Sequence, residues 1–523
     1  MATIRELVLG QLRRWRMTTI FGDPGSTEAS FAHDLPADFR YVLGLQEAVV
    51  VGMADAHAQV TGTPTLVNLH GTAGLGDAMG AIVNAARNKS PLVITAGGEG
   101  TPHSEPLFAP TAVKWVHEPH RAEDVPAALA RARLIADTPP RGPVILSLPA
   151  HDLDTEVDEA RARAAETLAE RHVAVAAAGD PQALAALAER LTQAEKPALI
   201  CGSEIDADGT WEDAVALAER LRTPVWSAPA ESRATFPQDH WLYQGALPPD
   251  MGPLDETLDG HDLVVVLGAP VFRRRHPVPG DYPPAGTTLV QLTSDPGEAA
   301  RAPFGDAVIA DVGYALQTLL DLIEDPKQPN PRAEPAERRP LDPGGTKGSP
   351  LDPAAVFTAL ARSAPAHTRW VHEAPTHADF FPRHVKLTRP GSYFAAADGG
   401  SGFGLPAAVA AQLADPSRPV IGLIGDGPVQ YAVCALWTAA AYRVPVTIVV
   451  TVDGESAFPG APGRGIDVSA IATGYGVRAH RAVDAVHLAS LLEEATTSKD
   501  GPTLIEVPVR TVFPGTQNGR DER

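Results

Sequence analysis

Short apolar runs alternate with Ala-rich segments along most of the chain. The first part has apolar runs at 63–70 and 90–97, the middle part has one at 262–270, and the last part has two at 419–427 and 445–454. Between them lie segments with apolar residues at helical spacing. Such alternation is typical of parallel sheets with helices on their faces. The pattern predicts an α/β fold of three successive domains with mainly parallel sheets.

Two segments divide this pattern. Residues 325–353 carry many prolines and charges and no apolar period, so they are predicted to be a linker rather than part of a packed domain. A charged, helix-forming stretch at 154–172 leads out of the first part. We therefore expect a first domain over 1–175, a central domain over 176–324 and a last domain over 354–523.

The composition limits the classes of partner. The chain of 523 residues has 43 Lys and Arg against 64 Asp and Glu, a net charge of -21. This charge repels phosphate backbones and anionic lipids, so neither nucleic acid nor a membrane surface is expected as a partner. No window reaches about 18 uninterrupted apolar residues, and the N-terminus lacks a signal-peptide pattern, so we expect a soluble, cytoplasmic protein. Cys201 and Cys434 lie at or near apolar runs and are expected to be buried and unbridged.

Two predicted strands of the last domain end on carboxylates. One run stops at Gly425, Asp426 and Gly427, and the next stops at Asp453, 27 residues after Asp426. That spacing is one βαβ unit, so both strand ends can face one pocket. The glycines let the backbone turn beside a ligand, and carboxylates suit Mg²⁺, which completes its shell with phosphate oxygens. The unit predicts a magnesium-diphosphate site, although Gly-Asp-Gly alone is also an ordinary turn.

Several longer motifs occur along the chain in an order and spacing that are typical of one enzyme family. They are residues 21–82, which begin FGDPGSTEASF, followed by VVLGAPVFR, DPGEAARAPFGDA, PGSYFAAADGGSGFGLPAA and GDGPVQYAVCALWTAA. Together they resemble the thiamine diphosphate (ThDP)-dependent 2-oxo acid decarboxylases, in particular the benzoylformate decarboxylase branch. The resemblance implies pyrimidine-binding, central and diphosphate-binding domains. It also implies a homo-oligomer, a dimer of dimers by family habit, with the cofactor held between two subunits.

The resemblance implies roles for several residues. Glu47 matches the glutamate that hydrogen-bonds the cofactor aminopyrimidine and so promotes loss of the thiazolium C2 proton. Ser26 and His70 match the polar residues that contact the substrate carboxylate and move protons around its carbonyl. His276 is the candidate for a second catalytic histidine, although Arg275 occupies the aligned position. Two explanations of this offset remain open: the loop is shifted by one residue and keeps the role, or the proton relay is lost. The neighbouring arginines either attract an acidic substrate or are simply solvated.

The family's cofactors imply the remaining site residues, with Mg²⁺ bound by the side chains of Asp426 and Asp453 and the backbone carbonyl of Glu455. The positions expected to line ThDP are Pro24, Glu373, Gly399, Ser401, Gly425, Gly427, Tyr431 and Gly454.

The sequence also departs from the family pattern. Asp453 stands where Asn is usual, which strengthens attraction to the cation but adds repulsion toward the diphosphate. Ser401 replaces a bulky aliphatic residue that supports the bent cofactor, and the proline-containing segment after Glu455 opposes the aromatic-rich helix that walls the pocket in relatives. A second contraction occurs at 96–115. We expect a wider or more open pocket.

The implied reaction is non-oxidative decarboxylation of a 2-oxo acid, with a benzoylformate-like aryl substrate first, to an aldehyde and carbon dioxide. One alternative is a carboligase or C–C lyase, in which a second carbonyl takes the place of the proton. The other is a degenerate member with a binding or structural role, for which the changes at 275, 401 and 453 would mark lost catalysis. The motif HEPH at 117–120 is assigned to the surface, because Pro119 breaks helical spacing.

Overall fold

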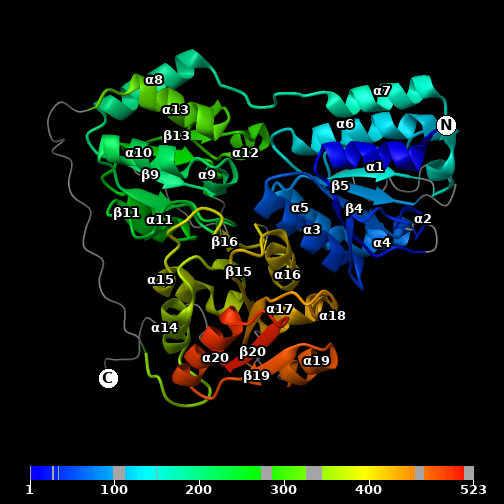
Figure 1. Cartoon of the computed structure of the whole chain (residues 1–523). Helices are drawn as coiled ribbons and strands as arrows, with labels where there is room; N and C mark the ends of the chain where they lie inside the picture. Colours follow the sequence, from blue (N-terminus) through cyan, green and yellow to red (C-terminus); the bar gives the residue numbers. More distant parts are fainter. Residues whose placement is uncertain are drawn as a thin grey trace. The chain divides into compact units, whose positions relative to one another are not determined.

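The computed structural model of the chain describes residues 2–25, 29–32, 34–97, 112–148, 150–272, 286–325, 344–397, 399–453 and 465–511. These residues pack as two compact units, and Figure 1 labels many of their helices and strands. The first unit comprises Met1–Val175, Gly344–Ala378 and Ala395–Arg523, and the second comprises Ala176–Pro343 and Asp379–Phe394.

The first unit contains an N-terminal sheet of six parallel strands in the order β3-β2-β4-β5-β7-β6. Its strands are β2 (Thr19–Gly22), β3 (Arg40–Leu43), β4 (Thr65–Leu69), β5 (Leu92–Ala96), β6 (Val116–His117) and β7 (Val144–Ser147). Its helices are α1 (Ile4–Arg14), α2 (Ala29–Ala32), α3 (Glu47–Thr61), α4 (Gly71–Asp77), α5 (Met79–Arg87), η2 (Ala122–Asp124), α6 (Val125–Asp137), η3 (Ala150–Asp154) and α7 (Glu159–Glu170). A two-stranded antiparallel ribbon pairs β1 (Ala2–Thr3) with β8 (Glu156–Val157).

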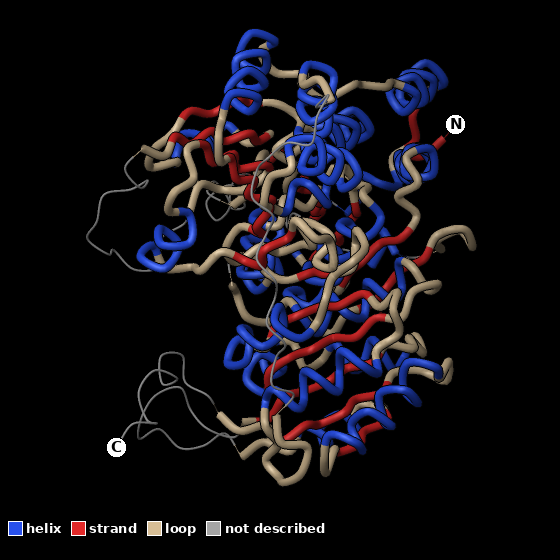
Figure 2. Tube along the Cα trace, turned by 90° about the vertical axis from the view of Figure 1, so that its left-hand side faces the viewer, coloured by secondary structure: helices blue, strands red, loops and turns tan. Residues whose placement is uncertain are grey.

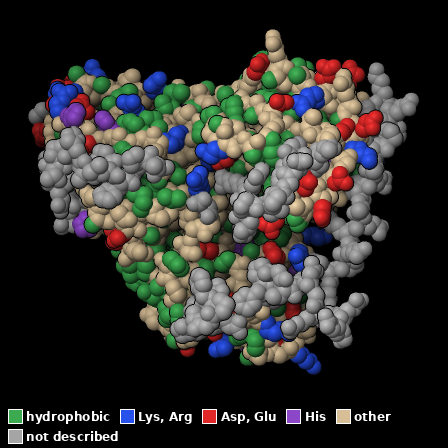
Figure 3. Space-filling model, turned by 180° about the vertical axis from the view of Figure 1, so that it is seen from behind, with side chains coloured by type: hydrophobic (Ala, Val, Ile, Leu, Met, Phe, Trp, Pro, Cys, Tyr) green, Lys and Arg blue, Asp and Glu red, His purple; other side chains and the backbone are tan. Residues whose placement is uncertain are grey.

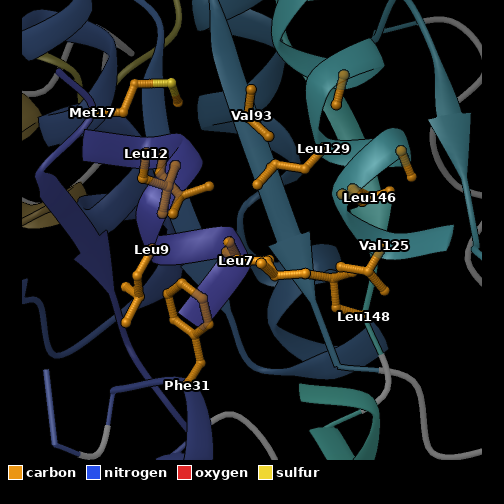
Figure 4. Close-up of a cluster of buried hydrophobic side chains, with 14 of the residues drawn as sticks. Leu7, Leu9, Leu12, Met17, Phe31, Val93, Val125, Leu129, Leu146 and Leu148 are labelled. Atoms are coloured by element: carbon orange, nitrogen blue, oxygen red, sulfur yellow. The ribbon is translucent and has the colours of Figure 1, made fainter. Parts of the chain in front are cut away.

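One face of this sheet is covered by α1 and α6. Figure 4 shows Leu7 of α1 extending toward Val125 of α6, and Leu129 of α6 beside Val93 of β5. Helix α1 begins at this place because Thr3 and Glu6 form a capping box, in which each side chain bonds the other residue's backbone N–H. The apolar cluster does not include Asp23 and His70, which follow the carboxyl ends of β2 and β4 and belong to the polar site described below.

A second sheet of the first unit runs in the order β15-β17-β18-β20-β19, and all of these pairs are parallel. Its strands are β15 (Arg369–Glu373), β17 (Val420–Gly425), β18 (Thr447–Val452), β19 (Arg478–Arg481) and β20 (Thr503–Pro508). Its helices are α14 (Pro353–Ser363), α16 (Gly404–Ala414), α17 (Asp426–Tyr431), α18 (Ala435–Ala441), α19 (Val468–Gly474) and α20 (Ala485–Thr497), and η4 (Pro375–Phe380) follows β15. Strands and helices alternate along the traced chain in Figure 2.

Helix α16 joins the two sheets of the first unit. Residues 404–412 are all buried, and all of them except Gln412 are apolar or glycine, as expected of a helix that is covered on every side. It packs on β15 and β17 of its own sheet and on α3 of the N-terminal part. On α3, Gly52 leaves room for Pro406, since a Cβ at Gly52 would lie 2.9 Å from the Pro406 ring. The pairing of these helices brings the start of α3 to the start of α16.

The second unit has a six-stranded parallel sheet in the order β11-β10-β9-β12-β13-β14, the doubly wound order. Its strands are β9 (Pro197–Cys201), β10 (Val225–Ser227), β11 (Tyr243–Ala246), β12 (Leu263–Leu267), β13 (Thr288–Thr293) and β14 (Asp306–Ile309), and the later segment of the unit carries the short strand β16 (Tyr393–Phe394). Its helices are α8 (Pro181–Gln193), α9 (Ser203–Ala207), α10 (Trp211–Leu221), α11 (Met251–Leu258), α12 (Pro296–Arg301), α13 (Val312–Leu322) and α15 (Phe381–His384).

The segment 379–394 is fixed within the second unit by polar contacts. Asp206, which is buried, pairs with Arg233 at 2.8 Å and accepts a hydrogen bond from the Gly391 backbone N–H. Leu387 exchanges two hydrogen bonds with Gln238, one through each residue's backbone N–H. A buried ion pair contributes to stability only when its remaining groups are bonded, as they are for Asp206.

The fold prediction is confirmed: three parallel sheets with flanking helices follow one another along the chain. The predicted domain bounds, including the linker, stay predictions. Both cysteines are free, Cys201 buried and Cys434 half-buried. Within the described residues, no helix combines the length and the apolar character needed to cross a membrane. On the face shown in Figure 3, acidic and basic side chains are interspersed.

Candidate active site

A polar cluster occupies the carboxyl end of the N-terminal sheet. Asp23, Pro24 and Gly25 follow β2, and His70 follows β4, its neighbour in the sheet. Because parallel strands end at the same edge, these residues come together. A Cβ at Gly25 would lie 2.4 Å from Cδ2 of His70, so the imidazole packs directly on this glycine.

Glu47, the first residue of α3, belongs to the same cluster. Its side chain is only 9 % exposed, and it lies against α4, where a Cβ at Gly74 would be 2.4 Å from Oε1. Burial raises the pKa of Glu47, and the charges of Asp23 and Asp77 raise it further, against opposing effects of the backbone and His70. A raised pKa makes a carboxyl easier to protonate, which suits a group that accepts and returns a proton.

Two acids in this cluster were not predicted from the sequence. Burial raises the pKa of Asp23, while the charge of His70 lowers it. Asp77 ends α4 and acts on Glu47 through its charge. The signal for Asp23 was present, since it is the first polar residue after the apolar run of β2. No sequence signal pointed to Asp77, because an exposed acidic residue at the end of a short helix is common.

The predicted metal ligands lie at the carboxyl end of the second sheet. Strands β17 and β18 are neighbours, with Gly425 opposite Thr451, so Asp426 and Asp453 follow adjacent strand ends. Asp426 is buried, and its Oδ1 accepts a hydrogen bond of 2.8 Å from the Gly427 backbone N–H. Asp453 is half-buried.

These oxygen donors fit a small, hard cation. Among the described residues, no group of three or more His, Cys, Asp and Glu side chains is arranged to hold a metal ion. An ion bound by Asp426 and Asp453 therefore needs further ligands from backbone or from a ligand, which is how Mg²⁺ binds diphosphates. The donor set thus agrees with a magnesium-diphosphate site.

Glu373 ends β15, the strand beside β17, and holds the loop that precedes α16. Its two carboxylate oxygens accept hydrogen bonds of 2.7 Å each from the backbone N–H groups of Gly402 and Gly404. Burial raises the pKa of Glu373 to about 7, and the backbone N–H donors oppose this rise. The side chain therefore has a partner within the chain, at the helix N-terminus where an anion is favoured.

The loop held by Glu373 contains predicted cofactor positions. Gly399 and Gly402 have φ of +69° and +96°, in the left-handed region that favours glycine. Ser401 lies between them, and Tyr431, which is 64 % exposed, ends α17. Ser401, Gly402, Phe403 and Tyr431 line a cavity of about 220 Å³ together with Gln46, Ala48, Gly52, Asp55, Asp77, Gly80, Ala81 and Asn84. The residues on either side of Glu47 thus share a cavity with the loop.

The described structure divides the predicted site residues between the two sheets. Pro24, Glu47 and His70 lie at the N-terminal sheet, and Glu373, Gly399, Ser401, Gly425, Asp426, Gly427, Tyr431 and Asp453 lie at or near the carboxyl end of the second sheet. Ser26, His276, Gly454 and Glu455 lie outside the described residues. The roles of all these residues stay predictions.

Family models of thiamine pyrophosphate enzymes match three parts of the chain. The N-terminal TPP (thiamine pyrophosphate, another name for ThDP) binding domain matches residues 2–123, the central domain residues 184–319, and the C-terminal TPP binding domain residues 376–458.

Individual relatives match over nearly the full length. The chain is 44 % identical to the benzoylformate decarboxylase of Pseudomonas aeruginosa, covering 98 % of this chain and 100 % of the relative. The solved structure of the ThDP-dependent 4-hydroxybenzoylformate decarboxylase of Rhodococcus jostii RHA1 is similar with a TM-score of 0.91 and 41 % identity, covering 98 % of this chain and 100 % of that one. That of benzoylformate decarboxylase from Polynucleobacter necessarius is similar with a TM-score of 0.90 and 36 % identity, covering 98 % and 99 %.

These matches in sequence and in fold confirm the resemblance. With the three domain matches in the expected order, they establish that the chain belongs to the family of ThDP-dependent 2-oxo acid decarboxylases.

Proposed function

We propose that this protein decarboxylates an aryl 2-oxo acid of the benzoylformate kind to an aldehyde and carbon dioxide, using ThDP and Mg²⁺. Similarity to two benzoylformate decarboxylases and a 4-hydroxybenzoylformate decarboxylase over nearly the whole chain supports the substrate class. The observation that carries the proposal is the Glu47 carboxyl, which is buried, has a raised pKa and lies in one cluster with His70.

The cofactors have candidate ligands on the second sheet. Asp426 and Asp453 would hold Mg²⁺ by their side chains and Glu455 by its backbone carbonyl, with Gly425, Gly427 and Gly454 letting the diphosphate approach the backbone. ThDP, when bound, supplies the electron sink that lets the carboxylate leave as carbon dioxide.

Glu47 and His70 would handle the protons. The Glu47 carboxyl would hydrogen-bond the aminopyrimidine of bound ThDP and hold a proton there, a role that its raised pKa favours. His70 then places an imidazole nitrogen at the substrate carbonyl, in the space that Gly25 leaves beside it. Ser26 would donate to the substrate carboxylate, and His276 would be the second acid or base.

The proposed assembly is the one that the resemblance to the family implies. We propose a homo-oligomer, a dimer of dimers, in which Glu47 of one subunit and the metal ligands Asp426 and Asp453 of another serve one cofactor. A complete site would then require two subunits, so dilution to monomers would abolish ThDP binding and activity together.

The test is a titration followed by product analysis. The protein is stripped of ligands with a chelator, and its melting temperature is measured with ThDP, with Mg²⁺ and with both. Benzoylformate, 4-hydroxybenzoylformate and pyruvate are then supplied, and aldehyde and carbon dioxide are quantified. We expect stabilisation by the pair, equal amounts of both products from the aryl substrates, and a fall in rate of about 100-fold or more in Glu47→Gln.

Other outcomes would contradict the proposal. A carboligase would be identified by two results together. With an added acceptor aldehyde, carbon dioxide would be released along with a carboligation product. Without the acceptor, little free aldehyde would form. No stabilisation by ThDP and Mg²⁺ would support the degenerate alternative.

A further inference from the structure

Two asparagines of the N-terminal part bind the backbone of the loop before α16. Asn88, at the C-terminal end of α5, accepts a hydrogen bond of 2.9 Å from the Ala397 backbone N–H through Oδ1. Asn84, one helical turn earlier, donates a hydrogen bond of 3.2 Å from Nδ2 to the Gly400 carbonyl. Both asparagine side chains are buried. Two side chains from one face of α5 therefore hydrogen-bond this loop, at Ala397 and at Gly400.

Asn88 is oriented by a buried acid. Its Nδ2 donates a hydrogen bond of 2.8 Å to Oδ2 of Asp55, which is only 1 % exposed. The other oxygen of Asp55, Oδ1, accepts from Gln59 Nε2 at 2.9 Å and from Ser90 Oγ. With the Asn88 amide nitrogen on Asp55, its oxygen must face Ala397. Asp55 thus sets which way the asparagine presents itself to the loop.

The loop is held at its other end as well. Glu373 binds the backbone N–H groups of Gly402 and Gly404. Between the two attachments the chain has little spare room, since a Cβ at Gly400 would lie 2.4 Å from Oδ1 of Asn84. Within the described residues, this loop is thus held from inside the chain, at Gly400 by Asn84 and at Gly402 by Glu373.

We propose that Asn84 and Asn88, with Asp55 orienting Asn88, are positioning residues that set the affinity of this chain for ThDP. This inference rests on the proposed function, in which Gly399 and Ser401 line the cofactor. A loop already in its binding conformation loses less conformational entropy when the ligand binds, so release of the loop weakens binding. The N-terminal part of a chain would in this way control the cofactor site on the second sheet of the same chain.

An exchange of the two side chains tests the pair. In Asp55→Asn the new side chain has one acceptor oxygen in place of two, so its nitrogen faces either the Asn88 amide nitrogen or the Gln59 and Ser90 donors. In Asn88→Asp two carboxylates face each other. Each single variant should weaken ThDP binding at saturating Mg²⁺ by about tenfold or more. The double variant D55N/N88D should restore the four hydrogen bonds named above. The new amide at position 55 keeps its oxygen for Gln59 and Ser90 and donates to the new carboxylate at position 88, which still accepts from Ala397. Its dissociation constant should return to within about threefold of the wild type.

A structural effect is separated from a positioning effect by a matched control. Gln412 is a buried amide on α16 that, like Asn88, makes two hydrogen bonds, to the backbone of Arg418 and Val420. Gln412→Ala should lower the melting temperature of the ligand-free protein and leave the ThDP dissociation constant unchanged. Asn84→Ala, which leaves the Asp55 contacts in place, provides a second variant should the charged ones not fold, and it should weaken ThDP binding by a few-fold.

The readout is the ThDP dissociation constant from calorimetry, so no catalytic turnover is needed. A wild-type protein that binds ThDP while Asn84→Ala and both single variants bind it equally well would overturn this inference and leave the proposed function intact. Unrestored affinity in the folded double variant would also overturn it. A wild-type protein that binds no ThDP would overturn both.

Discussion

The carboxylate of Glu47 lies directly against the α-carbon of Gly74, so closely that a Cβ there would be 2.4 Å from Oε1. Gly74 lies within α4, where alanine is the better helix former by about 1 kcal/mol. Glycine at this position therefore weakens the helix and gives space to the acid. Because Gly74 has no side chain, the Glu47 carboxylate can occupy this position.

Gly74→Ala should reduce activity without unfolding the protein. The added methyl group pushes the Glu47 carboxylate from its place, and a displacement of about 1 Å can lower a rate about 100-fold. We expect a fall in kcat of that order. Gly76 is the matched control, since it lies in the same helix and a Cβ there would meet nothing within 4 Å. Gly76→Ala should raise the stability by up to about 1 kcal/mol and keep kcat.

Steady-state kinetics gives kcat, and thermal unfolding gives the stability, of the wild type and of both variants. Equal kcat in the wild type and in Gly74→Ala would mean that the position of the Glu47 carboxylate is unimportant for the rate.

Gly25 has the corresponding relation to His70. A Cβ at Gly25 would lie 2.4 Å from Cδ2 and 2.5 Å from Nε2, so Gly25→Ala should turn the imidazole away. We expect kcat/KM for the 2-oxo acid to fall by about tenfold or more, and the ThDP dissociation constant to stay the same because the imidazole is not a proposed cofactor ligand. Gly10→Ala, which adds a methyl group to α1 with nothing within 4 Å, is the control. Weaker ThDP binding in Gly25→Ala would show that the change acts through the cofactor position predicted at Pro24 and not through His70 alone.

The sequence reveals those parts of the site that follow the ends of strands. Apolar runs that stop on polar residues mark strand ends, and the βαβ spacing between Asp426 and Asp453 predicts neighbouring strands. The structure has β17 beside β18 as a parallel pair, as a βαβ unit requires. Glu47 and His70 were found through the family motifs, because a glutamate at a helix start is common and says little by itself.

The asparagines that hold the loop could not be predicted from the sequence. Asn84 lies in an ordinary helical run and Asn88 at its end, and their partners lie 316 and 309 residues further along the chain. No local pattern encodes such a pairing, which arises only when α3 and α16 pack together. For the same reason no local pattern indicated that the Glu373 carboxylate binds the Gly402 and Gly404 amides, and its place as a cofactor-lining residue, taken from the resemblance, stays a prediction.

Asp453→Asn should bind ThDP and Mg²⁺ at least as tightly as the wild type. Two carboxylates, Asp426 and Asp453, end adjacent strands, and a diphosphate would add further negative charge. Asparagine keeps an oxygen ligand and removes one of these charges. Titration of ThDP at fixed Mg²⁺ measures the change, and Asp426→Asn, which alters the more buried acid, should bind about tenfold more weakly. Clearly weaker binding by Asp453→Asn would show that its charge is needed to hold the ion.

Acid should unfold this protein partly through His372. The residue is buried in β15, and burial lowers its pKa to about 4 from 6.5. The folded state therefore binds the proton less readily than the unfolded state, so this contribution to stability is present above pH 6.5 and is lost as the pH falls toward 4. The shift corresponds to about 3 kcal/mol.

The difference between the wild type and His372→Asn isolates this residue from other titrating groups. Unfolding by urea is followed at several pH values for both proteins, and for Gln412→Ala, which removes a buried polar side chain that does not titrate. The advantage of the wild type over His372→Asn should shrink by about 3 kcal/mol between pH 6.5 and 4, whereas its advantage over Gln412→Ala should stay constant. A constant difference for His372→Asn would mean that the imidazole keeps its proton equally well in both states, against its burial in the strand.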